Sequence, residues 1–137
     1  MTERRVLLVV GSTGVIEGPL VSARSVVIAD VRGLDIAHWQ MHRVEWDQRP
    51  DDGETDRRVI GLVTDLRVEA IVVDEIAPRL RESLAIAGVA VFQRAGISAR
   101  AAAVSAATVL ALVQHTLWRG TVARADFESH GRCVTAG

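Results

Sequence analysis

Two neighbouring carboxylates, Asp74 and Glu75, stand directly after the apolar run 70–73 (AIVV), and Pro78 follows in the same short stretch. Such an apolar run is typical of a buried strand, and a proline at this spacing is typical of the first turn of a helix. Open α/β sheets bind ligands beyond the carboxyl ends of their strands. The pattern therefore places both carboxylates at an edge of the sheet where a binding site is expected.

Other polar residues are expected at the same edge. Ser12 and Thr13 follow the apolar run 6–10 (VLLVV), and Arg94 follows the run 89–92 (VAVF). In a shared pocket the hydroxyl groups would donate hydrogen bonds, the carboxylates would accept them, and the arginines would hold an anionic group. The candidate ligand-binding residues are Ser12, Thr13, Asp74, Glu75, Arg79 and Arg94.

A second interpretation of the carboxylates needs no ligand. A negative charge near the start of the helix that begins at Pro78 would stabilise that helix by up to about 1 kcal/mol. We expect this to be the first role of at least one of Asp74 and Glu75, with ligand contact as a second role. We also expect that side chain to be partly exposed, beside the loop at residues 12–13.

No arrangement of residues in the sequence predicts catalysis. Adjacent strand residues point to opposite faces, so Asp74 and Glu75 are poorly placed to act together as acid and base. The turn 11–14 (GSTG) lacks the Gly-Lys ending of a phosphate-binding loop and the glycine spacing of a dinucleotide-binding motif. We therefore predict no catalytic residue and no enzymatic activity.

No metal site is predicted either. His38 and His42 would lie about 13 Å apart on an extended strand, which is too far for one ion. His130 and Cys133 supply only two ligands at a plausible spacing. Cys133 is the single cysteine, so a disulfide within one chain is excluded.

Composition restricts the class of protein. The chain has 137 residues, 49% of them hydrophobic, which suits one packed domain. The net charge is −1 and gives no electrostatic reason to bind nucleic acid or an anionic membrane. No apolar segment approaches the roughly 18 residues needed to span a bilayer. We expect a soluble, cytoplasmic protein that binds a small ligand or forms a homodimer.

Apolar periodicity predicts the order β-β-β-α-β-α-β-α. The expected strands are residues 6–10, 25–31, an edge strand 36–46, 70–73 and 89–92. Strands 6–10, 70–73 and 89–92 should be parallel, with 25–31 antiparallel to them. The fold class expected is a three-layer α/β sandwich with a five-stranded mixed sheet. One domain would cover residues 1–120, followed by a loosely ordered tail, 121–137.

Helix ends are predicted from capping residues. Thr55 should cap the first helix, and the second should start at Pro78 and stop at Gly88. The last helix should follow Ser98 and end at Gly120. Its buried stripe is expected to consist of Ala102, Ala106, Val109, Val113 and Leu117.

The stretch 68–79 (VEAIVVDEIAPR) resembles a segment of the iron–molybdenum cofactor biosynthesis family of nitrogenase, the NifX type. There a strand ends in Gly-Gly-Ile-Gly-Pro-Arg before a helix. Residues 84–92 and 96–98 resemble the strand and the helix start that follow in that family, and 27–31 (VIADV) agrees in outline. The resemblance covers roughly residues 5–112, the scale of one domain. It implies a ribonuclease-H-like sandwich that binds an iron–sulfur or iron–molybdenum cluster.

Two departures from the family pattern concern the cluster itself. Pro19, Leu20 and Val21 occupy the positions of a His-Phe-Gly element. Asp74 and Glu75 replace Gly-Gly, and Ala77 replaces the glycine before the proline. Carboxylates would repel an anionic cluster that glycines would admit. The expected protein is a family member whose cluster site is missing or rebuilt.

Three functions remain open at this stage. The first is a small binding or carrier module related to metallocluster-binding proteins, with the cluster ligands lost. The second is a dimeric protein-interaction module without ligand chemistry. The third is a metal-dependent hydrolase that uses Asp74, Glu75 and one of Asp30 or Asp35, although the strand order disfavours their convergence.

Overall fold

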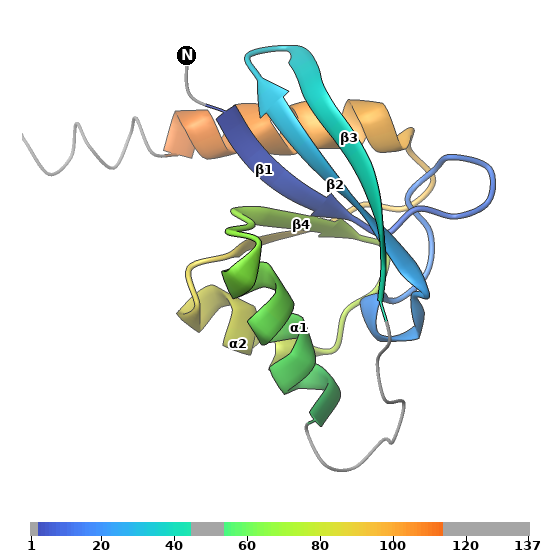
Figure 1. Ribbon diagram of the computed structural model, residues 1–137, viewed down its shortest axis with the longest axis vertical. Helices are drawn as coiled ribbons and strands as arrows, with labels where there is room; N and C mark the ends of the chain where they lie inside the picture. The colour runs from blue at the N-terminus through green and yellow to red at the C-terminus, as the bar shows by residue number, and fades with distance from the viewer. Residues whose placement is uncertain (1–2, 45–53, 114–137) are drawn as a thin grey trace, which may run out of the picture.

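The computed structural model describes residues 3–44 and 54–113, arranged around one five-stranded sheet with the order β3-β2-β1-β4-β5 (Figure 1). β1, β4 and β5 are parallel, whereas β2 is antiparallel to β1 and to β3. The predicted mixed sheet and its strand directions are confirmed. The strands are β1 (Glu3–Leu8), β2 (Ser25–Arg32), β3 (Asp35–Arg43), β4 (Ala70–Val73) and β5 (Ala90–Gln93).

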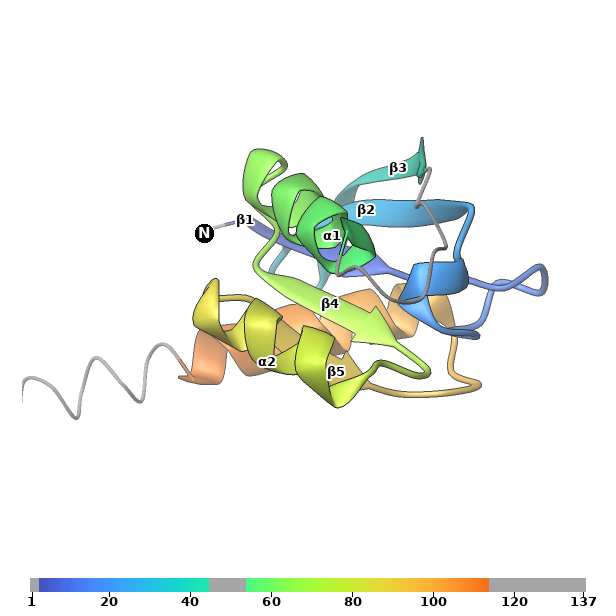
Figure 2. The same ribbon diagram turned by 90° about the horizontal axis from the view of Figure 1, so that it is seen from below.

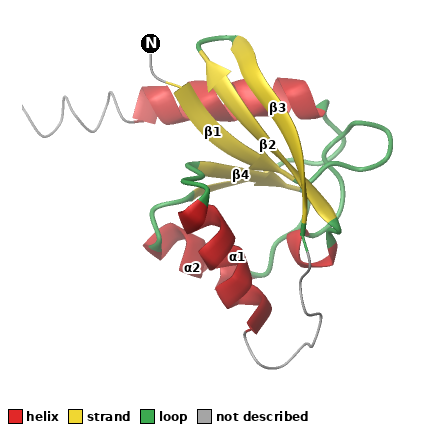
Figure 3. Ribbon diagram, viewed as in Figure 1, coloured by secondary structure: helices red, strands yellow, loops and turns green. Residues whose placement is uncertain are grey.

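Helices cover both faces of the sheet, which makes the three-layer α/β sandwich expected from the sequence (Figures 1 and 3). α1 (Glu54–Asp65) and α2 (Pro78–Ile86) pack on one face, and a helix over residues 99–113 packs on the other. Alternate residues of β1 enter the two cores: Leu7 faces α1 and α2, whereas Leu8 faces the last helix. Burial on both sides explains why this strand ends in an unbroken apolar run.

The Arg5 side chain joins β1 to β2 through a bidentate ion pair and reaches the residue after α1 through a further hydrogen bond. Arg5 Nε lies 2.8 Å from Asp30 Oδ1, and Arg5 Nη1 donates a 2.8 Å hydrogen bond to the Leu66 carbonyl oxygen. The hydrogen bond to Asp30 raises the pKa of the Arg5 guanidinium. Asp30 is the one charged or polar residue that is buried among the described residues, with 8% of its surface exposed. It therefore has a structural partner that the sequence did not reveal.

Two details of the helix prediction are wrong. Thr55 lies inside α1, which already includes Glu54, so it does not precede the helix as a cap. In the last helix Val109 and Val113 are 37% and 49% exposed. The predicted burial of Ala102 and Ala106 is confirmed. The other buried residues of that helix are also alanines, Ala99, Ala103 and Ala107, with Val104 and Leu110 partly buried beside them.

The other helix ends follow the prediction. α2 starts at Pro78, and Gly88 just beyond it has a φ of 84°, a conformation that favours glycine. Ser98 caps the last helix, because its Oγ accepts a hydrogen bond from the Ala101 N–H at 3.4 Å. Within the described ranges, no helix has the length and apolarity needed to cross a membrane.

Several predictions fall on residues that the structure does not describe. These are Trp46 at the end of the edge strand, Leu117 and Gly120 at the end of the last helix, and His130 and Cys133 in the tail 121–137.

Candidate functional site

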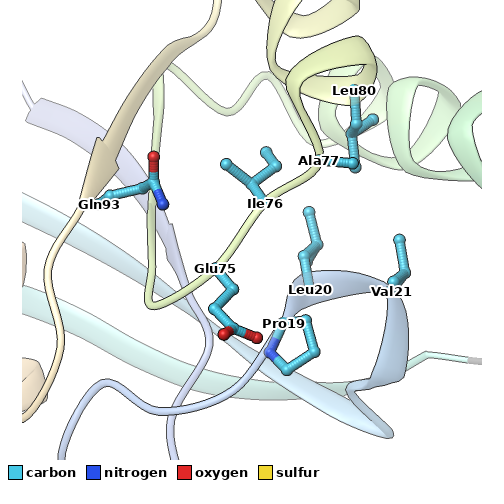
Figure 4. A pocket seen from close by; sticks show the side chains of 8 residues that line it. All are labelled: Pro19, Leu20, Val21, Glu75, Ile76, Ala77, Leu80 and Gln93. Carbon is cyan, nitrogen blue, oxygen red and sulfur yellow. The ribbon is translucent and has the colours of Figure 1, made fainter.

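A pocket of about 470 Å³ lies at the carboxyl edge of the sheet, where the segment after β4 approaches the segment between β1 and β2 (Figure 4). The short 3-10 helix Leu20–Ser22 contributes to one wall, and the chain leading into α2 forms the other. Hydrophobic side chains dominate the lining. The lining residues are Pro19, Leu20, Val21, Glu75, Ile76, Ala77, Leu80 and Gln93.

Asp74 holds the two walls together. Its Oδ2 atom accepts a 3.2 Å hydrogen bond from the Gly18 N–H, and the next residues, Pro19 and Glu75, form an isolated parallel β-bridge. Gly18 has a φ of 88°, a backbone conformation that favours glycine. The hydrogen bond to Asp74 therefore depends on a glycine at position 18. By accepting this hydrogen bond, the Asp74 carboxylate links the two segments beside the pocket.

The Glu75 carboxylate is the charged group of the pocket. Figure 4 shows this carboxylate beside Pro19, and Glu75 is an exposed residue. The carboxylate makes no hydrogen bond or ion pair with the described residues. Gln93 is the second polar lining residue and is already engaged. Its Oε1 accepts a 2.6 Å hydrogen bond from Arg81 Nη1, and its Nε2 donates to the Asp74 carbonyl oxygen at 3.4 Å. Glu75 therefore remains available to a ligand.

The structure brings together some of the predicted site residues and separates others. Ser12 and Thr13 form the exposed turn after β1 and do not line this pocket. Arg79 is exposed on α2 outside the lining, and Arg94 Nη1 donates a 2.8 Å hydrogen bond to the neighbouring Gln93 carbonyl oxygen. The segment that meets the carboxylates is the one at Gly18, and it was not part of the predicted set.

Neither Asp74 nor Glu75 makes a hydrogen bond to the start of α2, and the expected effect of their charge on this helix stays a prediction. The residue before the helix is Ala77, no side chain makes a capping hydrogen bond, and the first turn contains no acidic residue. Asp74 bonds to Gly18 instead, because the preceding loop offers a free amide. The expected partial exposure is confirmed, since Asp74 is partly buried and Glu75 is exposed.

A hydrolytic metal centre finds no support in the described residues. They contain no group of three or more His, Cys, Asp or Glu side chains able to hold an ion. Asp30 is occupied by Arg5, and Asp35 lies on β3 away from the pocket lining.

The sequence did contain a signal for the lining residues that were not predicted. Pro19, Leu20 and Val21 depart from the His-Phe-Gly pattern of the family that the sequence resembles, and Glu75 and Ala77 depart from its glycine pattern. Both sets line the same pocket. Departures from distant parts of the chain that converge on one pocket are a useful pointer to it.

Comparisons with solved structures find the same fold elsewhere. The chain is similar to a protein called PH0822, with a TM-score of 0.53 and 16% identity over 65% of this chain and 75% of that one. It is also similar to "a putative dinitrogenase (MJ0327)" from Methanocaldococcus jannaschii. The crystal and NMR structures of that protein each give a TM-score of 0.50 and 10% identity, over 70% of this chain and 80% and 78% of theirs. At such low identity the likeness concerns the fold.

Sequence comparisons add nothing to this. Neither a scan of protein-family models nor a search of curated proteins gives a match.

Proposed function

We propose that this chain is a small, cytoplasmic, single-domain binding or carrier module with the fold of dinitrogenase-related proteins and a rebuilt pocket. Its ligand is a small organic molecule with an apolar body and one cationic or hydrogen-bond-donating group. The observation that carries the proposal is the Glu75 carboxylate, which has no partner in the described part of the chain, in a pocket whose other walls are mostly hydrophobic.

The size and lining of the pocket suit such a ligand. Small-molecule pockets usually measure about 300–1,000 Å³ and combine apolar walls with a few polar groups that fix orientation. The pocket of about 470 Å³ falls in this range, with Leu20, Ile76 and Leu80 among its apolar residues. Leu20 and Leu80 also belong to the core beneath the pocket, so the walls are held in place before a ligand arrives.

Charge argues against a metal cluster in this pocket. Clusters are held by thiolate or imidazole groups, and the described residues that line the pocket include no cysteine or histidine. The position of the family's histidine is taken by Pro19, which has neither an imidazole nor a backbone N–H. The carboxylate of Glu75 would repel an anionic cluster, whereas it attracts a cation.

The test uses three probes with the same apolar body: cyclohexylamine, cyclohexanol and cyclohexanecarboxylate. Binding to the isotope-labelled chain is followed by amide chemical shifts during titration. We expect millimolar affinities in the order amine, alcohol, carboxylate, with shifts concentrated at the amides of Leu20, Val21 and Ile76. Equal binding of amine and carboxylate, or shifts elsewhere on the chain, would refute the proposal.

A matched pair of variants isolates the charge. Glu75→Gln should remove most of the preference for the amine, about two- to fivefold, because an exposed ion pair contributes up to about 1 kcal/mol. It should leave the affinity for the alcohol unchanged. Glu82→Gln removes an exposed carboxylate of α2 outside the pocket lining and should leave all three affinities unchanged.

A further inference from the structure

A second, smaller pocket shares Pro19 with the pocket that holds Glu75. It has a volume of about 170 Å³ and lies at the carboxyl end of β1, between the returning segment 17–19 and the start of β2. Polar side chains are more prominent in its lining than in the first pocket, and they include Glu17, Ser22 and Arg24. The second pocket therefore suits a polar ligand rather than an apolar one.

The polar side chains of the second pocket have no partners in the described part of the chain. The carboxylate of Glu17, the hydroxyl group of Ser22 and the guanidinium group of Arg24 make no hydrogen bond or ion pair with any residue in residues 3–44 and 54–113. A carboxylate accepts hydrogen bonds, a guanidinium donates them, and a hydroxyl does both. The pocket thus offers both signs of charge, and neither is neutralised by the other.

The Glu17 carboxylate has a defined place although it has no partner. A Cβ atom added to Gly11 would overlap Glu17 Oε2 and would lie 3.0 Å from Glu17 Cβ and Cδ. Gly11 is not among the glycines with positive φ, so backbone conformation does not explain a glycine at this position. The space that the Glu17 side chain occupies does explain it.

Both charged side chains point to the face of the sheet that α1 and α2 cover. Directly opposed residues of an antiparallel pair share a face. Glu17 lies opposite Val9, to whose carbonyl oxygen its N–H donates a 3.2 Å hydrogen bond. Arg24 lies opposite Val44, whose N–H donates a 2.9 Å hydrogen bond to the Arg24 carbonyl oxygen. Val9 and Val44 both belong to the core on the α1 and α2 face, so the carboxylate and the guanidinium lie on the same side of the sheet.

We propose that the second pocket binds a small free amino acid in its zwitterionic form. The ammonium group of the ligand pairs with Glu17, its carboxylate pairs with Arg24, and the Ser22 hydroxyl group completes the polar contacts. A volume of about 170 Å³ equals the share of about six water molecules in the liquid, which suits glycine or alanine and excludes a large side chain. This site is separate from the Glu75 pocket and does not depend on the ligand proposed there.

Charge selects a zwitterion over a simple ion. A cation without a carboxylate would be attracted by Glu17 and repelled by Arg24, and the reverse holds for an anion. A zwitterion is attracted by both residues. Because Glu17 and Arg24 are exposed, each ion pair contributes only a few-fold to the affinity, and the site should be weak.

Three matched probes test the proposal: L-alanine, L-alaninamide and N-acetyl-L-alanine. The amide keeps only the positive charge, and the acetylated form keeps only the negative charge. The isotope-labelled full chain is titrated with each probe, and amide chemical shifts are followed. Alanine should bind about two- to fivefold more tightly than either derivative, with shifts concentrated at Val10, Glu17 and Ala23. Phenylalanine should bind more weakly than alanine, because its side chain exceeds the pocket.

Charge variants should show a crossed pattern. Glu17→Gln should weaken alanine and alaninamide about two- to fivefold and leave N-acetylalanine no weaker, whereas Arg24→Gln should weaken alanine and N-acetylalanine and leave alaninamide no weaker. Glu82→Gln and Arg79→Gln remove the same charges from exposed positions of α2 outside the pocket lining. These two controls should leave all three affinities unchanged.

A glycine variant moves the carboxylate without removing its charge. Gly11→Ala displaces the Glu17 carboxylate and should therefore reproduce the pattern of Glu17→Gln, whereas Gly61→Ala adds a methyl group in open space and should change no affinity. Alanine that does not bind saturably, equal binding of the three probes, shifts centred on Ile76, or charge variants that match their controls would each overturn the proposal. Binding of cyclohexylamine at Ile76 is measured separately, so the two pockets succeed or fail independently.

Discussion

Replacing Asp74 separates two ways in which its carboxylate can stabilise the fold. In the structure Asp74 Oδ2 accepts a 3.2 Å hydrogen bond from the Gly18 N–H, and no side chain caps α2. If the hydrogen bond is what matters, the residue at this position must keep an acceptor oxygen. If negative charge near the start of α2 matters instead, the residue must keep its charge.

The size of the effect follows from the partial burial of the contact. Hydrogen bonds to charged groups contribute about 1.5–3 kcal/mol, and access of solvent reduces this value. We therefore expect Asp74→Ala to lower the free energy of unfolding by about 1–1.5 kcal/mol. Asp74→Asn keeps a carbonyl oxygen at the same place and should lower it by no more than about 0.5 kcal/mol.

Urea unfolding of the two variants and the wild-type chain measures these differences. Glu75→Ala is the matched control, because its carboxylate is adjacent but has no partner among the described residues. It should change the free energy of unfolding by less than about 0.5 kcal/mol. Equal losses for Asp74→Asn and Asp74→Ala would show that charge at the helix end dominates. A loss of several kcal/mol, or none, for Asp74→Ala would refute the hydrogen-bond argument altogether.

Other predictions concern single features of the fold. Gly61→Ala should raise the free energy of unfolding by about 0.5–1 kcal/mol in urea, since Gly61 is exposed within α1 and an added methyl group meets nothing, whereas Gly18→Ala should lower it by about 1 kcal/mol because of its positive φ. Asp30→Ala should lower the melting temperature clearly, by an amount equivalent to about 1–2 kcal/mol, because Arg5 loses its bidentate partner. Arg32→Ala, which breaks an exposed pair, should change it little; equal effects would contradict the role given to burial. The chain purified without oxygen should show no visible absorbance from a stoichiometric iron–sulfur cluster, and absorbance that a chelator removes would contradict this.

The strands could be predicted because burial on both faces of the sheet requires short runs of apolar residues, which are visible in the local sequence. β4 is buried on both faces, and all four of its residues are apolar. The start of β1 was less visible. The strand begins at Glu3, before the apolar run, because its pairing with β2 continues as far as the exposed ion pair between Glu3 and Arg32. Such a pair joins distant parts of the chain and leaves no local pattern.

The last helix shows where hydrophobicity misleads. Val109 and Val113 continue the apolar stripe of Ala102 and Ala106, yet 37% and 49% of their surfaces are exposed. The buried face consists of alanines, whose small side chains let the helix lie close to the sheet. Periodicity predicted the helix and two of its buried residues, Ala102 and Ala106, whereas the rest of the buried face depends on how the helix lies on the sheet.

Asp74 and Glu75 lie at the predicted edge of the sheet, but their neighbours there are Gly18 and Pro19 rather than Ser12 and Thr13. The chain after β1 first forms an exposed turn at Ser12 and Thr13, and Ile16 then pairs with Ile97 through a 2.9 Å backbone hydrogen bond. Only after this detour does Gly18 reach Asp74. Figure 2 shows the 3-10 helix of the same segment close to the end of β4. No local signal in the sequence predicts how far a loop travels before it returns.

The β-bridge between Pro19 and Glu75 gives a physical reason to treat the two departures from the cluster-binding pattern as one change. The resemblance sets a histidine at position 19 and a glycine at position 75, and the structure makes these positions direct neighbours. A cluster would need a ligand at the first position and open space at the second. In this chain, Pro19 has no side-chain atom that could bind a metal, and the Glu75 carboxylate fills the space that a glycine would leave open. Restoring the histidine alone would set an imidazole beside Glu75, which would pair with it and compete with iron. The change of ligand class that we propose for this pocket therefore requires both positions to change together.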